Sequence, residues 1–190
     1  MVINVFAFLK KYSDQIFKLV LNQIAMTFFG LIVSLATSEN DTLFLLSSIF
    51  AILLYLFLEG SVLFELGEKD NIRVEAGHIA PMPLKGLWIA LAANGVNLLL
   101  GILSEVGYLI SAGGEFPHWA AQMREVCNII ARFIQSMYAG LIYTYAPHNP
   151  IALVLIVLPS LGICALAYFC GAKGFYLSKL LGIRKKKENK

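Results

Sequence analysis

Residues 133–172 read FIQSMYAGLIYTYAPHNPIALVLIVLPSLGICALAYFCGA and contain no charged side chain in 40 residues. Pro147 and Pro150 divide this stretch, because proline interrupts a helix and forces the preceding residue towards extended geometry. The second part, residues 151–172, is long enough to cross a bilayer core of about 30 Å as a helix. The first part, residues 133–145, reaches only about 20 Å as a helix. The stretch therefore predicts one full membrane span preceded by a partial one.

The whole chain shares this apolar composition. Of its 190 residues, 58% are hydrophobic and only 14% are charged, whereas soluble domains are about 45–50% apolar and about 25% charged. So few charged residues cannot cover the surface of a soluble domain, and the same figures exclude a disordered, collagen-like or disulfide-rich chain. The net charge of +3 is too small to indicate a nucleic-acid partner. The composition predicts an integral membrane protein whose partner is the lipid bilayer.

Three more apolar segments are long enough to be spans. Four spans are therefore expected, at about residues 17–38, 42–66, 84–111 and 149–173. The first follows a basic leader, which also fits a cleaved signal peptide, although Asn22 and Gln23 interrupt its apolar run. The length fits a single integral membrane domain. The predicted fold class is all-α, a polytopic bundle of transmembrane helices.

The segments between and after the spans are polar. Residues 67–83 carry many charges and end at two prolines, which predicts a cytoplasmic loop. Residues 118–146 are amphipathic, since apolar side chains recur at helical spacing and Arg124 lies on the opposite face. This pattern is typical of an interfacial helix, and also of a helix with one face inside a bundle. The tail, residues 174–190, would attract anionic lipid through its basic run of Arg184, Lys185, Lys186 and Lys187.

The distribution of basic residues distinguishes two topologies, because Lys and Arg are enriched in cytoplasmic loops. With four spans, and residues 118–146 as an interfacial or re-entrant helix on the outer face, both termini are cytoplasmic. This topology places 13 of the 15 basic residues inside. With five full spans the division is only 9 to 6. The four-span topology is preferred, and five full spans are the alternative.

A polar stripe on the third span is the main candidate site. Glu105 shares one helical face with polar residues at steps of three or four, namely Asn94, Asn97 and Tyr108. A carboxylate inside a bilayer is costly and often functional, so Glu105 is a candidate proton or cation site. The alternative is a structural ion pair between Glu105 and Arg132 near the outer leaflet. Glu59 is a secondary candidate, for which placement at the cytoplasmic interface is the simpler interpretation.

Other chemistry finds little support in the sequence. Cys127, Cys164 and Cys170 lack C-x-x-C spacing and are interpreted as packing thiols. Glu115 and His118 have a carboxylate–imidazole spacing, but a proline separates them and zinc sites show clearer ligand patterns, so no metal site is predicted. No P-loop, G-x-S-x-G or H-E-x-x-H motif occurs. Neither a catalytic residue nor a cofactor is therefore predicted.

Two segments carry a resemblance to known proteins. The first is ELGEKD at residues 65–70, which continues through Arg73 and Gly77 to LKGLW at residues 84–88. The second is YFCGAK at residues 168–173, before the basic tail. Together they resemble small uncharacterised bacterial multi-pass membrane proteins, over half of the chain. The resemblance implies a location in the bacterial cytoplasmic membrane and no particular activity.

Three functions fit these features, and the first is preferred. The polar stripe indicates a small-solute transport component. The short length and sparse polar interior indicate a non-catalytic partner subunit of a membrane complex, or a homo-oligomer. A membrane-embedded enzyme would need polar residues that converge at one depth. All three place the protein in the cell membrane.

The topology predicts which positions an impermeant thiol reagent reaches from outside intact cells. In a variant without native cysteines, His78→Cys and a cysteine in the basic tail should both stay unlabelled, because both lie on the cytoplasmic side. Glu39→Cys, in the turn after the first span, should be labelled and serves as the positive control. Labelling at position 78 but not in the tail would contradict the four-span topology.

Overall fold

The computed structural model describes residues 5–112, 118–147 and 149–174. Within these residues every regular element is a helix, so the predicted all-α class is confirmed. Three segments are long and apolar enough to cross a membrane, and a fourth counts if one bent pair is a single span. The three are α2 (Ser13–Thr37), α3 (Asp41–Glu75) and α8 (Ala152–Leu155) with α9 (Leu158–Ala172). The bent pair is α4 (Lys85–Ala93) and α5 (Gly95–Ala112), between which the helix direction bends by 63°.

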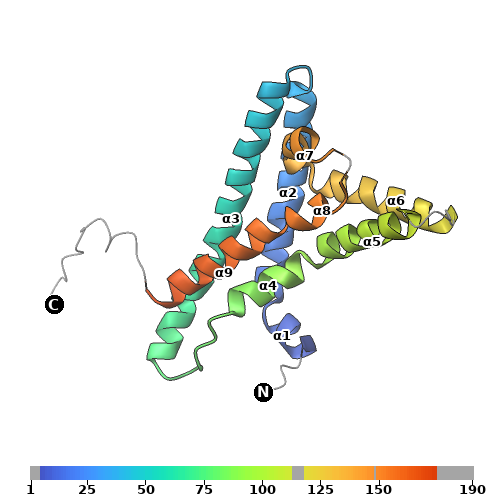
Figure 1. Cartoon of the computed structure of the whole chain (residues 1–190). Helices are drawn as coiled ribbons and strands as arrows, with labels where there is room; N and C mark the ends of the chain where they lie inside the picture. Colours follow the sequence, from blue (N-terminus) through green and yellow to red (C-terminus); the bar gives the residue numbers. More distant parts are fainter. Residues whose placement is uncertain (1–4, 113–117, 148, 175–190) are drawn as a thin grey trace.

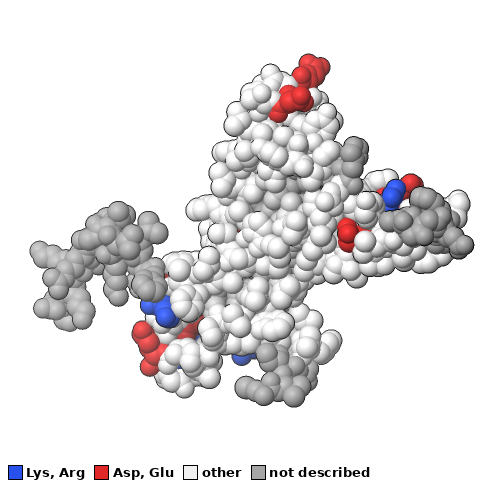
Figure 2. Space-filling model, in the orientation of Figure 1, with Lys and Arg blue, Asp and Glu red and all other residues white. Residues whose placement is uncertain are grey.

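Helices α2 and α3 form a long antiparallel hairpin against which α4, α7 and α9 pack (Figure 1). Asn40 fixes the turn, because its Oδ1 accepts hydrogen bonds of 3.1 Å from the backbone N–H groups of Thr42 and Leu43. The opposite end of the hairpin carries α1 (Val5–Lys11), the α3–α4 connection and the end of α9 (Figure 1). Figure 2 shows charged side chains at the ends and tips of the molecule and a largely uncharged middle. This distribution is compatible with a membrane protein.

Helix α3 extends well beyond the predicted second span. The sequence predicts a loop over residues 67–83, but α3 continues to Glu75. No proline interrupts it, and Lys69 pairs with Glu65 one turn away at 2.6 Å. The chain turns only at Gly77, whose φ of +74° suits a residue without a side chain. The connection to α4 is therefore shorter than predicted, at residues 76–84.

Helix α9 runs parallel to α3 and lies close against it. A Cβ added to Gly67 would lie 3.0 Å from the Cα of Gly171, and one added to Gly60 would lie 3.2 Å from a methyl group of Ile163. Small residues at such an interface allow two helix backbones to approach. The residue numbers rise together on both helices, which establishes the parallel direction. This contact fixes which α9 side chains meet α3.

The segment at residues 118–146 is not one helix. α6 (His118–Ile134) packs along α5, and the two form an arm that projects from the hairpin (Figure 1). After a break at Gln135, η1 (Ser136–Tyr138) and α7 (Ala139–Tyr145) return to the hairpin. There the Gly140 N–H donates a hydrogen bond of 2.8 Å to the Ser48 hydroxyl group. Neither α6 nor α7 is a candidate span, so the five-span alternative gains no support.

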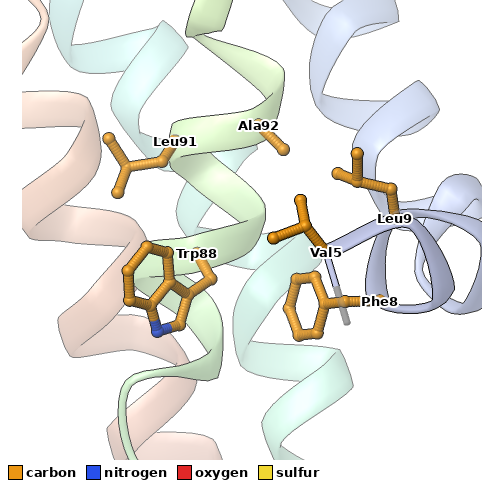
Figure 3. A pocket seen from close by; sticks show the side chains of 6 residues that line it. All are labelled: Val5, Phe8, Leu9, Trp88, Leu91 and Ala92. Carbon is orange, nitrogen blue, oxygen red and sulfur yellow. The ribbon is translucent and has the colours of Figure 1, made fainter. Parts of the chain in front are cut away.

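An apolar pocket of about 360 Å³ lies between α1 and α4. Phe8 of α1 and Trp88 of α4 flank it (Figure 3). The other lining residues are Val5, Leu9, Leu91 and Ala92. Among the described residues the lining carries no charged side chain, so it offers apolar packing.

The close contact between α3 and α9 predicts a position-specific cost for added side chains. Gly171→Ala should lower the free energy of unfolding by about 1–3 kcal/mol, because overpacking forces the backbones apart. Gly162→Ala is the matched control, since a Cβ there meets nothing within 4 Å. Thermal unfolding in detergent micelles measures both. Equal stability of the two variants would contradict the contact.

Candidate functional site

Glu59 lies near the middle of α3, and only 1% of it is exposed. Its Oε2 accepts a hydrogen bond from the hydroxyl group of Ser160 on α9, and the thiol of Cys164 donates to the same oxygen at 3.7 Å. The hydroxyl group of Tyr55, one turn earlier on α3, lies beside the same carboxyl group. The sequence alone favours an interfacial Glu59. The structure instead encloses it, because α9 packs against this face of α3.

Two helix interruptions meet at this carboxyl group. α4 ends at Ala93 with Asn94 as its C-cap, and the break between α8 and α9 precedes Pro159. The side-chain amide of Asn94 donates to the Ala90 carbonyl oxygen at 3.1 Å and to the Ser160 hydroxyl oxygen at 3.3 Å. Asn94 therefore caps the end of α4 and joins it to the residue that binds Glu59. Interrupted helices at membrane depth are tolerated where protein groups satisfy the freed backbone.

The polar chain continues from Asn94 to a cavity. The Asn97 amide donates to Asn94 Oδ1 at 3.4 Å. Asn97, Gln23 and Thr27 are the polar residues of an otherwise apolar pocket of about 290 Å³ beside α2, and the Gln23 Nε2 has no hydrogen-bond partner among the described residues. Along Asn97, Asn94, Ser160 and Glu59, every donor points towards Glu59. A carboxylate, which only accepts hydrogen bonds, is a suitable end for such a chain.

These polar groups converge on the middle of three candidate spans. Glu59 lies near the centre of α3, and Ser160 and Cys164 lie near the centre of the segment Ala152–Ala172. Asn94 lies at the bend between α4 and α5. The sequence predicts Asn94 and Asn97 as part of one candidate site and Glu59 as a separate, secondary one. It misses Ser160 and Cys164, because a lone hydroxyl group and a lone thiol in an apolar run carry no signal of their partner.

A buried ion pair lies three turns further along α3. Lys85 Nζ is 2.6 Å from Asp70 Oδ2, and the two residues are only 3% and 2% exposed. The Tyr168 hydroxyl group donates to the same oxygen at 2.9 Å, and the Lys85 ammonium group lies 5.1 Å from the centre of the Tyr12 ring. This network joins α3, α4 and α9 to Tyr12 in the connection between α1 and α2. At about 1.5 Å rise per residue it lies about 16 Å along α3 from Glu59.

The sequence does not predict this ion pair, because the charges and prolines of residues 67–83 place Asp70 in a loop. The periodicity of α3 contains a signal, however. Leu63, Leu66 and Gly67 are buried at helical spacing, and Asp70 is the next position on that face. Extending the predicted helix through residue 70 would place the Asp70 carboxylate on a buried face. It would then require a basic partner, because a buried charge is costly unless it is paired.

The other predicted site residues lie away from Glu59. The stripe from Asn94 to Tyr108 assumes one straight helix, but the bend at Asn94 turns α5 into the arm with α6. Glu105 is not in an ion pair with Arg132 within the described residues, and its Oε2 is buried without a hydrogen-bond partner there. Arg132 donates instead to the Pro147 carbonyl oxygen at 2.7 Å. Glu115 and the basic tail with Arg184, Lys185, Lys186 and Lys187 lie outside the described residues.

The chemistry of the site follows from its donors and acceptors. One carboxyl group with hydroxyl, thiol and amide neighbours can hold a proton or a monovalent cation. Among the described residues no group of three or more His, Cys, Asp or Glu side chains is arranged to hold a metal ion. In the same part of the chain the cluster around Glu59 includes no histidine to activate Ser160 or Cys164 as a nucleophile.

No protein-family model matches the chain, and neither a curated protein nor a solved structure is significantly similar to it. The resemblance of residues 65–88 and 168–173 to small bacterial multi-pass membrane proteins therefore stays a prediction.

The buried ion pair predicts an asymmetric response to substitution. Asp70→Asn leaves the Lys85 ammonium group buried without an anionic partner and should lower the free energy of unfolding by about 3–5 kcal/mol. The double variant Asp70→Leu with Lys85→Met removes both charges and should recover most of this loss. Chemical denaturation in detergent measures the difference.

The matched control is Lys69→Met, which removes the exposed pair with Glu65 on the same helix. An exposed pair contributes at most about 1 kcal/mol. If Asp70→Asn destabilised no more than Lys69→Met, the ion pair would not hold these helices together.

Proposed function

We propose that the protein is a small-solute transport component of a membrane, in which Glu59 is the site of a coupling proton or monovalent cation. The observation that carries the proposal is the enclosed carboxyl group at the meeting point of two interrupted helices. Ionisable groups inside a membrane are expensive and by default functional. Transporters place ion and substrate sites near the middle of the bilayer, at discontinuous helices.

The path from Glu59 to the cavity supports the same proposal. Asn97, Asn94 and Ser160 form a continuous series of hydrogen bonds between the cavity beside Gln23 and the carboxyl group. The two amides orient hydrogen-bond donors towards the carboxyl group without themselves passing a proton, and the pocket provides space for a small solute next to Asn97. The unpartnered Gln23 amide offers a hydrogen-bond donor to such a solute. Glu105, the first candidate from sequence, lies outside this path.

The proposed setting is the bacterial cytoplasmic membrane, with several spans and both termini on the cytoplasmic side. The positive-inside distribution of Lys and Arg supports this setting. The described first and last helices, α1 and α9, reach the same end of the α2–α3 hairpin (Figure 1). The Asp70–Lys85 pair lies towards that end. The pair joins α3 to α4 on the proposed cytoplasmic side of Glu59.

The experiment is uptake into proteoliposomes that carry an imposed pH or sodium gradient. The reconstituted protein is supplied with a panel of radiolabelled amino acids, sugars and carboxylates. Glu59→Gln should abolish gradient-driven uptake, because the amide keeps the shape and hydrogen bonds of the side chain but cannot change charge. The variant should still insert and unfold at a similar temperature.

Glu105→Gln and Glu65→Gln are the matched controls and should retain uptake, because neither residue belongs to the hydrogen-bonded series. A wild-type protein that takes up nothing above empty vesicles would contradict the proposal. So would a Glu59→Gln variant with wild-type uptake. Loss of insertion or of thermal stability in Glu59→Gln would assign the carboxyl group a structural role instead.

A partner subunit is the second candidate function, and the arm formed by α5 and α6 favours it. The arm projects from the hairpin (Figure 1) and exposes large apolar side chains, including Leu99 and Ile102 on α5 and Ile129 and Phe133 on α6. A partner helix or a second copy of the chain would cover this surface. Co-purification of a stoichiometric partner in mild detergent would support this function.

A further inference from the structure

A polar groove of about 540 Å³ lies on the arm, where α5 and α6 meet the connection between α7 and α8. Two arginines of α6 line it, Arg124 and Arg132, with Asn128 between them. The three are four residues apart and therefore lie on one helical face. The remaining lining residues are Tyr108, Glu125, Ile129, Pro147 and Pro150. The proposed transport path does not use this groove.

The two guanidinium groups leave most of their donors available. Neither forms an ion pair within the described residues, where the pairs are Lys69–Glu65, Arg73–Asp70 and Lys85–Asp70. Arg132 uses one nitrogen to donate to the Pro147 carbonyl oxygen at 2.7 Å. This bond holds the Arg132 side chain across the groove. An arginine has five N–H donors, so the fixed Arg132 still offers a fork to a ligand.

We propose that this groove binds a phosphate group. Arginine forks match the geometry of phosphate oxygens and donate two parallel hydrogen bonds to them. The Asn128 amide and the Tyr108 hydroxyl group supply further donors from two different helices. Glu125 is the acidic residue among the described lining residues, and it opposes an anion without neutralising both arginines.

The phosphate group can belong to a lipid headgroup or to a soluble anion. The apolar face of α6 fits the first source, and the openness of the groove fits the second. The opposite face of α6 exposes Trp119, Val126 and Phe133 to 59%, 55% and 53%. An amphipathic helix of this kind lies in the membrane interface with its polar face at headgroup level. The groove is also open, so a soluble phosphate can enter it.

The experiment measures binding to the purified full-length protein with two probes. Native mass spectrometry in detergent follows phosphatidylglycerol, with phosphatidylcholine as the competing lipid, and calorimetry follows inorganic phosphate. Arg124→Gln should weaken binding of the true ligand by about tenfold or more, because a hydrogen bond to a charged group is usually worth at least that factor. Glu125→Gln should strengthen binding.

Two more variants separate a specific groove from general attraction to basic residues. Arg124→Lys with Arg132→Lys keeps both charges but loses the fork, and it should bind as weakly as Arg124→Gln. Lys10→Gln with Lys11→Gln removes two charges from α1 and should bind like the wild type. Arg124→Gln also leaves the Arg132–Pro147 bond intact, so it tests binding without removing that contact.

The two probes assign the source of the phosphate group. Binding of phosphatidylglycerol alone identifies a lipid headgroup, and binding of inorganic phosphate alone identifies a soluble anion. The proposal is overturned if the wild type binds neither probe. It is also overturned if Arg124→Gln binds as tightly as the wild type, or if Lys10→Gln with Lys11→Gln causes the same loss.

Discussion

The close parallel contact between α3 and α9 is the constraint on which the rest of the structure depends. Gly67 and Gly171 bring the two backbones together, and no larger side chain fits between them without moving a helix. This register places Ser160 against Glu59 and Tyr168 against Asp70. Both buried carboxyl groups of α3 therefore receive hydrogen bonds from α9. Without this contact Glu59 would lose the donors from Ser160 and Cys164, and Asp70 would keep Lys85 but lose the Tyr168 hydroxyl group.

Polar groups cluster where helices are interrupted, and the interruptions have identifiable causes. Pro159 lacks an N–H group and cannot continue the hydrogen-bond ladder of α8 into α9. Asn94 and Gly95 form a sequence that ends helices readily, and the Asn94 amide bonds back to Ala90. An interruption inside a bilayer frees backbone groups that lipid cannot satisfy. The side chains of Asn94 and Ser160 partly meet this demand and also reach Glu59, so one set of hydrogen bonds serves the backbone and the carboxyl group.

The sequence predicted features that depend on composition and local pattern, and it missed those that depend on register. The long apolar runs predicted the helical class, and Asn94 and Asn97 could be singled out because amides are costly in lipid. The ion pair between Asp70 and Lys85 could not be found while residue 70 was placed in a loop. Pairing Glu59 with Ser160 requires knowledge of which α9 face meets α3, and two glycines decide that contact. The expected Glu105–Arg132 pair does not form within the described residues although α5 and α6 pack together, because Arg132 donates to the Pro147 carbonyl oxygen instead.

Helix α4 connects the two buried polar networks, because each of its ends is held by one of them. Lys85 at its start binds Asp70 of α3, and Asn94 at its end binds Ser160 of α9. Between these ends Ile89 and Ala90 are fully buried, so the helix also packs tightly along its length. A rigid helix of nine residues cannot tilt or turn without breaking contacts at one end or the other. The position of α4 is therefore determined jointly by the ion pair and by the hydrogen bonds around Glu59, and a change of charge at either network acts on the same helix.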